Sequence, residues 1–380
     1  MDNKNKRILL TGGGTAGSVT PLLAVAEELE RHSDPALDAG EESRDFKIKQ
    51  DPSSRGIAEL RMTNRYDFLW LGTKSGPERE MVASASSAQG EREGIEFKAI
   101  ASGKLRRYFS WRNFFDLFLI KLGFVQSFFI ILKWKPDLVM TAGSFVSVPV
   151  VWAAWLFRIP VLVHQQDARP GLANKLMAPF ARVITVTFEE SLKYFGKPAR
   201  LQGRRAVWTG NPVRQFPISN FQFSINEIKK KYGFKEELPV VLVVGGGTGA
   251  MAINELVWQS LDELTKFCQI IHVTGKNKIP RYKKPVYRTG RQDTRYKRYE
   301  FLNFDQMAEA YAAADIVASR AGMGVLTELS YLGKPTIIIP MPDSHQEDNA
   351  EIFKKKNAVI VLNQKELTAS RFVEEIKKLL

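Results

Sequence analysis

Two glycine-rich segments carry the clearest chemical signal in this sequence. Residues 12–17 (GGGTAG) follow the apolar run RILLT, and residues 245–250 (GGGTGA) follow the apolar run VVLVV. Glycines let a backbone approach an anion closely, and the start of the following helix offers free N–H groups and the positive end of its dipole. A single loop of this kind could be only a tight turn, and neither has the lysine of a P-loop or the strict dinucleotide spacing. Two of them facing across one cleft predict a site for a diphosphate or for two phosphorylated partners.

Two later segments carry side chains suited to a nucleotide and a sugar. Residues 319–328 (SRAGMGVLTE) follow an apolar strand, and their small residues are expected to start a helix that places Glu328 near the cleft. A carboxylate there can accept hydrogen bonds from two ribose hydroxyls. Residues 340–350 (PMPDSHQEDNA) follow another apolar strand, at the end where α/β folds bind ligands, and are rich in partners for sugar hydroxyls. The competing interpretations are a solvated helix glutamate and a polar loop with a capping Asp or Ser.

Short apolar strands alternate with helices along the chain and position these segments. Such alternation is typical of parallel sheets covered on both faces. A strand, a glycine-rich loop and a helix occur twice, at 8–29 and at 240–261. We therefore expect an α/β protein of two Rossmann-like, doubly wound domains facing across a cleft, divided into 1–211 and 212–380 near the break at Gly210-Asn211-Pro212. Strands are expected at 7–11, 68–71, 138–141, 161–164, 183–186, 240–244, 270–273, 316–318, 336–339 and 359–362.

The composition is typical of a cytoplasmic globular protein with acidic partners. The chain has 380 residues and a net charge of +14, which suits nucleic acid, anionic lipid or phosphorylated small molecules. Its single cysteine, Cys268, excludes an intramolecular disulfide. The four histidines show no metal-ligand spacing, so no structural metal is expected. The N-terminus enters a strand directly, with no signal-peptide pattern.

A basic and aromatic stretch lies just ahead of the most apolar part of the chain. Residues 104–112 (KLRRYFSWR) combine four positive charges with Leu, Tyr, Phe and Trp. This combination suits an anionic bilayer or single-stranded nucleic acid. The following stretch, 117–134, is too short and too interrupted by polar residues for a spanning helix. We interpret it as a helix that is buried or that faces a membrane.

Taken together and in this order, the motifs resemble the MurG family, UDP-N-acetylglucosamine:undecaprenyl-diphospho-muramoylpeptide transferases of the GT-B fold. The resemblance covers nearly the whole chain. Besides the segments above, it rests on WLGTKSGPERE at 70–80, SGKLRR at 102–107, AGSFVSVP at 142–149, HQQD at 164–167, GLANK at 171–175 and TGNPVR at 209–214. It implies inverting transfer of N-acetylglucosamine from UDP to the 4-hydroxyl of a lipid-linked muramoyl peptide in peptidoglycan synthesis. The enzyme would act as a peripheral protein at the cytoplasmic face of the cell membrane.

The resemblance also implies roles for individual residues. The donor would contact Thr15, Ala16, Gly17, Arg214, Gly247, Thr248, Met323, Gly324, Val325, Glu328, His345 and Gln346, with Glu328 on the ribose and Gln346 on the sugar. The acceptor would contact Gly13, Gly14, Asp167 and Asn174. The family context favours an anionic membrane over nucleic acid, with contact through Leu105, Arg106, Arg107, Phe109 and Trp111. No Asp-x-Asp motif occurs, so no metal or other cofactor is expected, and helix N-termini with Arg214 would stabilise the departing UDP.

Several residues depart from the family pattern and leave the catalytic base open. Ser18 stands where the family usually has histidine, and a neutral serine cannot take up a proton at pH 7 without a base of its own. Gln165 replaces the usual glutamate, Asp167 replaces a frequent asparagine, and Gly247 replaces serine. The candidates for the catalytic step are thus Asp167, His164 and Ser18. The alternatives are a GT-B enzyme with another lipid acceptor and a catalytically degenerate scaffold that binds nucleotide sugars.

The end of the chain gives one further expectation. In this fold the last helix usually crosses back to the N-terminal domain, whereas here the sequence ends about one helix after Glu366. Without a crossing helix, closure of the two domains is expected to be looser.

Overall fold

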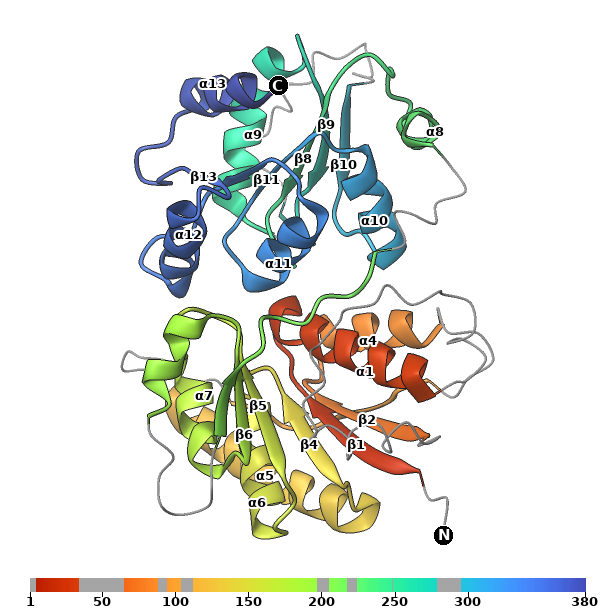
Figure 1. The fold of residues 1–380 in the computed structure, drawn as a ribbon, viewed down its shortest axis with the longest axis vertical. Coiled ribbons are helices and arrows are strands. Elements are labelled where there is room, and N and C mark those ends of the chain that lie inside the picture. The colour runs from red at the N-terminus through yellow and green to blue at the C-terminus, as the bar shows by residue number, and fades with distance from the viewer. Residues whose placement is uncertain are drawn as a thin grey trace, which may run out of the picture.

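The computed structural model describes residues 5–33, 65–87, 94–103, 112–196, 205–216, 224–247, 249–278 and 295–380. Within them the chain forms two α/β domains, each built on a parallel sheet, and Figure 1 shows the domains stacked one on the other. The fold class expected from the sequence is confirmed.

The N-terminal domain has a seven-stranded sheet in the order β3-β2-β1-β4-β5-β6-β7. The strands are β1 (Lys6–Thr11), β2 (Tyr66–Gly72), β3 (Glu96–Ala99), β4 (Leu138–Thr141), β5 (Val161–Gln165), β6 (Val183–Val186) and β7 (Arg205–Trp208). The helices are α1 (Thr20–Ser33), α4 (Glu78–Ser87), α5 (Arg112–Trp134), α6 (Ser147–Leu156) and α7 (Leu172–Met177), with 3-10 turns η1 (Ala16–Ser18), η3 (Ala178–Phe180) and η4 (Glu189–Tyr194). Successive strand residues point to opposite faces, so Leu9 and Leu10 enter two different apolar clusters.

The C-terminal domain has a six-stranded sheet in the order β10-β9-β8-β11-β12-β13. The strands are β8 (Val240–Val244), β9 (Gln269–Val273), β10 (Tyr296–Tyr299), β11 (Ile316–Ser319), β12 (Thr336–Ile338) and β13 (Ile360–Val361). The helices are α8 (Ile225–Lys231), α9 (Met251–Leu264), α10 (Phe304–Ala313), α11 (Met323–Leu332), α12 (His345–Lys355) and α13 (Ala369–Leu379). Every residue of β8 is buried, because helices cover both faces of the central strands.

The last helix, α13, stays within the C-terminal domain. It packs on α9, and its Phe372 and Ile376 are fully buried in the apolar cluster on that face of the sheet. No part of α13 supplies a tie to the N-terminal sheet, so contacts between the domains come from other elements.

Helix α5 and its neighbour α6 form an apolar side of the N-terminal domain. The side chains of Leu117, Phe118, Leu122, Val125, Phe129 and Leu132 are exposed on α5, as are Trp155 and Leu156 at the end of α6. The segment Asp116–Trp134 is long and apolar enough to cross a membrane by length and composition, and only 17% of it is buried. The expectation that residues 117–134 are too short and too interrupted for a spanning helix is therefore wrong on length and composition. The low burial favours the alternative of a helix that faces a membrane over that of a buried helix.

Candidate active site

The first glycine-rich loop is built around a buried carboxylate. Glu78, at the start of α4, is fully buried, and its Oε2 accepts a hydrogen bond from the Gly14 N–H at 3.0 Å. Its Oε1 accepts a hydrogen bond from the Thr73 N–H at 2.7 Å. A side chain at position 13 would overlap the Glu78 carboxyl group, so Gly13 is required for this close approach. The first loop is expected to hold the acceptor phosphates, but one of its N–H groups, that of Gly14, is already bonded to Glu78.

Ser18 is part of the internal structure of the same loop. It is buried, and its Oγ accepts a hydrogen bond from the Gly13 N–H at 3.1 Å. The same hydroxyl lies 3.3 Å from the Thr15 carbonyl oxygen, to which it can donate. These contacts give Ser18 the role of closing the loop around Gly13.

The two glycine-rich loops meet across the domain boundary. A Cβ placed on Gly247 would lie 2.7 Å from the Ala16 Cβ, so the second loop has no room for a side chain there. A Cβ placed on Gly324 would lie 3.3 Å from Thr20 Oγ1 and 4.0 Å from the Gly17 Cα. The loops therefore face each other as predicted, and the start of α11 joins them.

The first turn of α11 offers its N–H groups to this meeting point. Met323, Gly324 and Val325 form that turn, and the N-cap residue Gly322 makes no side-chain cap. The first N–H groups of a helix have no partner within the helix, which makes this end suited to an anion. Thr15, by contrast, is exposed at the rim, and Thr248 lies outside the described residues.

Glu328 lies in α11 as a half-buried carboxyl group. Its Oε2 accepts a hydrogen bond from the Tyr311 hydroxyl at 2.7 Å. Burial raises the pKa of Glu328 to about 7, against the opposing effects of the Tyr311 hydrogen bond and the positive charge of Arg214. The fully buried Tyr311 of α10 thus orients the carboxyl group that is expected to hold the ribose.

Arg214 is engaged by the opposite domain. Its guanidinium forms an ion pair with the Glu27 carboxylate of α1, with N–O distances of 3.0 and 2.5 Å. The same guanidinium stacks on the Phe304 ring, with its carbon 3.7 Å from the ring centroid. The cation predicted to contact a diphosphate therefore lies at the domain boundary, paired with a carboxylate that the sequence analysis did not single out.

His164 is a structural link between the domains. Its Nδ1 lies 2.8 Å from Thr185 Oγ1 and its Nε2 lies 2.8 Å from Asn211 Oδ1, so both ring nitrogens have partners. Asn211 in turn donates a hydrogen bond to Thr327 Oγ1 of α11 at 2.7 Å. Burial lowers the pKa of His164 to about 4, so the ring is neutral at pH 7.

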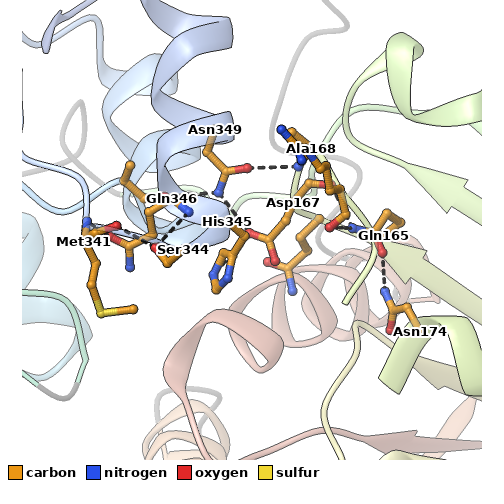
Figure 2. A network of polar contacts seen from close by, with 12 residues as sticks. Gln165, Asp167, Ala168, Asn174, Met341, Ser344, His345, Gln346 and Asn349 are labelled. Carbon is orange, nitrogen blue, oxygen red and sulfur yellow. Dashed lines mark hydrogen bonds and ion pairs between the residues drawn. The ribbon is translucent and has the colours of Figure 1, made fainter. Parts of the chain in front are cut away.

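Asp167 and α12 meet in a polar network across the cleft (Figure 2). The Asn349 Nδ2 donates hydrogen bonds to Asp167 Oδ1 at 2.9 Å and to the Ala321 carbonyl at 3.1 Å. The Asn349 Oδ1 accepts one from the Ala168 N–H at 2.9 Å, and His345 Nε2 lies 3.9 Å from Asp167 Oδ1. The structure thus brings the acceptor-side carboxylate beside the expected donor-side residues.

Gln346 and Asn174 occupy opposite sides of this network. The Gln346 Oε1 accepts a hydrogen bond from the Met341 N–H at 3.0 Å, which fixes its amide at the start of α12. The Asn174 Nδ2 donates to Gln165 Oε1 at 2.6 Å, while the buried Asn174 Oδ1 has no hydrogen-bond partner among the described residues. A buried acceptor without a partner is costly, and this oxygen is enclosed by the protein rather than open to a ligand.

The remaining sequence predictions concern metal binding and the membrane. The described residues contain no group of three or more His, Cys, Asp or Glu side chains arranged to hold a metal ion. The expected membrane residues Leu105, Arg106, Arg107, Phe109 and Trp111 lie outside the described residues.

Comparisons with known proteins extend over both domains. Residues 62–186 match the glycosyltransferase family 28 N-terminal domain, and residues 240–380 match the glycosyltransferase family 28 C-terminal domain. A protein of Clostridium kluyveri named UDP-N-acetylglucosamine–N-acetylmuramyl-(pentapeptide) pyrophosphoryl-undecaprenol N-acetylglucosamine transferase is 36% identical, covering 98% of this chain and 91% of that protein. A Clostridium tetani protein of the same name is 34% identical, covering 98% of this chain and 90% of that protein.

Solved structures share the two-domain fold. MurG of Acinetobacter baumannii has a TM-score of 0.59 at 23% identity, covering 98% of this chain and 90% of that chain. A UDP-GlcNAc 2-epimerase from Neisseria meningitidis bound to UDP-GlcNAc has a TM-score of 0.61 at 12% identity, covering 99% of this chain and 91% of that chain. At these identities the structures establish the fold alone.

Proposed function

The chain belongs to glycosyltransferase family 28 and, within it, to the MurG family, and on this premise we propose that it transfers N-acetylglucosamine from UDP to the 4-hydroxyl of undecaprenyl-diphospho-N-acetylmuramoyl-peptide. The observation that carries the proposal is the 36% identity to a transferase of that name over 98% of the chain. The fold alone does not identify the function, because a UDP-GlcNAc 2-epimerase shares it. The alternatives, another lipid acceptor or an inactive scaffold, are not favoured by these relatives.

The donor site of this proposal lies on the C-terminal domain. The diphosphate would bind at the second loop and the N-terminus of α11, where free N–H groups and the helix dipole favour negative charge. Glu328 would accept hydrogen bonds from the ribose, and Gln346 would contact the sugar. The developing negative charge on UDP would be stabilised by the α11 N-terminus and Arg214, with no metal ion assigned a role.

The acceptor site of this proposal lies on the N-terminal domain. The first loop would hold the lipid-linked diphosphate, and Asn174 would contact the acceptor only after a rearrangement that exposes its Oδ1. The transfer is an inverting displacement in which the acceptor oxygen attacks the anomeric carbon as UDP departs. Because the loops of the two domains touch, both substrates would react where the domains meet.

The membrane contact of this proposal is the exposed face of α5 with the end of α6. This face is a contiguous run of large apolar side chains, which is unusual for a surface in water. The basic and aromatic residues 104–111 precede α5 directly in the sequence, and each Lys or Arg near an anionic surface contributes roughly 1 kcal/mol. We assign this side of the molecule to peripheral binding at the cytoplasmic face of the cell membrane.

The proposal is tested by acceptor-dependent release of UDP from UDP-N-acetylglucosamine. Transfer to a lipid-linked muramoyl peptide is expected with the native chain, with and without EDTA, and the Asp167→Ala variant should be slower. A diacylglycerol acceptor should not serve, and UDP-N-acetylglucosamine alone should remain unchanged. Tight UDP binding without any turnover would instead identify a scaffold.

A further inference from the structure

The candidates for taking up the acceptor proton differ sharply in their contacts. His164 has hydrogen-bond partners at both ring nitrogens. One of them, Asn211, in turn donates a hydrogen bond to Thr327 of α11. Ser18 is bonded to the main chain of its own loop. Neither side chain can accept a proton from a substrate without first breaking the structure around it.

Most other carboxyl groups at the domain boundary are also engaged. The engaged groups and their partners are Glu27 with Arg214, Glu80 with Lys276, Asp348 with Arg169, and Glu78 with the Gly14 and Thr73 amides. A carboxylate held by a cation or by amides is a weak base, because those partners favour its charged form.

Asp167 and His345 face each other from opposite domains with a gap between them (Figure 2). The His345 Nε2 lies 3.9 Å from Asp167 Oδ1, and the two side chains are 53% and 33% exposed. This distance is too long for a direct hydrogen bond, and a hydroxyl group that enters beside the pair can donate its single proton to His345 Nε2 or to Asp167 Oδ1 but not to both. Asn349 fixes the carboxylate by donating to the same oxygen at 2.9 Å.

We propose that His345 is the general base of the transfer and that Asp167 is its partner, an inference that rests on the proposed function. The acceptor 4-hydroxyl donates its hydrogen bond to His345 Nε2 and gives this proton to it as the hydroxyl oxygen attacks the anomeric carbon of N-acetylglucosamine. The new carbon–oxygen bond forms while the bond to UDP breaks, and the electron pair leaves on the UDP oxygen. The imidazolium holds the proton beside the Asp167 carboxylate until solvent removes it, and imidazole is the commonest general base in proteins.

The test compares His345→Gln and Asp167→Asn with the native chain and with a control, Glu347→Gln, which removes an exposed carboxylate from the same helix. The kcat of His345→Gln is expected to fall by about 10²–10⁴-fold, and that of Asp167→Asn by about tenfold or more. Glu347→Gln should resemble the native chain, and calorimetry should show the same UDP affinity for all four proteins.

The pH profile separates a base from a structural residue. The pH profile of kcat for the native chain should have an acid limb that His345→Gln lacks, because a glutamine cannot take up the substrate proton. The other charged groups beside the pair are the Arg169–Asp348 ion pair and Glu347, and all of them remain in both variants compared.

Two results would count against the proposal in different ways. If the native chain transfers sugar but His345→Gln keeps its kcat and its acid limb, or loses UDP affinity instead of kcat, then His345 is not the base and the proposed function stands. If the native chain releases no UDP in response to the acceptor, the proposed function fails, and the assignment of His345 fails with it.

Discussion

Glu328 shows how a single residue sets the chemistry of the nucleotide site. Burial raises its pKa to about 7, while the Tyr311 hydrogen bond and Arg214 lower it. The ionised form offers more acceptor positions to ribose hydroxyls than the protonated form does. Affinity for UDP is therefore expected to weaken as the pH falls below about 7.

The Tyr311→Phe variant tests this arrangement. It removes the hydrogen bond to Glu328 but keeps the ring in the core, so UDP affinity at pH 7 should fall about tenfold, the effect of a hydrogen bond to a charged group. The weakening should also begin at higher pH, because the lost bond had lowered the pKa of Glu328. Calorimetric titration with UDP from pH 6 to 9 measures both effects. Tyr331→Phe, on the exposed side of α11, is the control, and equal affinities in the two variants would contradict the role of Tyr311.

Two buried histidines make the stability of the fold depend on pH. Burial lowers the pKa of His164 from 6.5 to about 4 and that of His272 from 6.5 to about 3. The unfolded chain binds these protons first, so the stabilisation is complete above pH 6.5 and is lost as the pH falls toward 4. Glu328 acts in the opposite sense, because its raised pKa gives stability below pH 4.5 that is lost as the pH rises through about 7.

We therefore expect the urea concentration at the midpoint of unfolding to decrease as the pH is lowered from 7 to 5. Each histidine contributes up to a few kcal/mol to this change in the free energy of unfolding. The His272→Gln variant should flatten this dependence, because a glutamine can hydrogen-bond with Tyr296 and Asn254 but cannot be protonated. Because Glu328 acts in the opposite sense, the decisive comparison is between the two proteins, and an identical pH dependence of the native chain and His272→Gln would exclude the effect of His272.

The residues that the sequence identified are those whose chemistry is local to a motif. Glu328 and Gln346 were predicted from segments in which strand, loop and helix start follow one another. Glu27 was not predicted, because its role comes from Arg214, which lies 187 positions away. It sits on an ordinary helix pattern, and only the packing of the two domains gives it a partner.

At the scale of elements, α5 packs against the core on one side and exposes apolar side chains on the other. Residues such as Phe124, Phe128 and Ile131 pack against the N-terminal core, while Phe118 and Phe129 are 66% and 62% exposed. A helix that is apolar all round needs an apolar environment on both sides. The protein supplies one side, and the proposed membrane contact supplies the other.

The double variant Phe118→Glu/Phe129→Glu tests the outward side of α5. Binding to vesicles containing anionic lipid should fall by about tenfold or more, since each exposed aromatic ring buries apolar area in the bilayer and each glutamate is repelled. Soluble UDP affinity should be unchanged. Tyr331→Glu, on the C-terminal domain, is the matched control in vesicle sedimentation, and equal binding by both proteins would place the membrane contact elsewhere.

The strands show which elements a pattern can find. All ten strands expected from apolar runs are present. Nine of them lie inside their sheets, where strands are buried on both faces, and the tenth, β13, is an edge strand. The strands that were missed, β3, β7 and β10, have the mixed sequences EFKA, RAVW and YKRY and lie at sheet edges. An edge strand has one free side and tolerates polar residues, so its sequence resembles that of a loop.

At the scale of the whole molecule, the two domains are held by a small apolar cluster and a few polar ties. Phe188 of the N-terminal domain packs on Phe353 of α12, and the same cluster contains Ala168 with Met323. The polar ties come from single residues such as Asn349. Contacts of this kind permit relative motion of the domains, as a transferase that must admit two substrates requires.

The Asn349→Ala variant tests how closure depends on one tie. It leaves the Ala168 N–H and Asp167 without their buried partner, which costs about 1–3 kcal/mol in the closed form. The population of open molecules should rise, seen as a larger radius of gyration in small-angle scattering without ligands. Asn226→Ala, an exposed change on α8, serves as the control. An unchanged radius for Asn349→Ala would mean that the apolar cluster alone holds the domains.

Glu27 is a counter-ion for Arg214 that the protein itself supplies. The guanidinium is neutralised from the opposite domain before any donor arrives. If Arg214 contacts the diphosphate as proposed, the nucleotide competes with this carboxylate for the guanidinium, and binding of the donor would exchange an interdomain ion pair for a substrate contact. Binding of the nucleotide would thereby be coupled to the ion pair between the two domains. Added salt should weaken both the ion pair and the binding of the nucleotide.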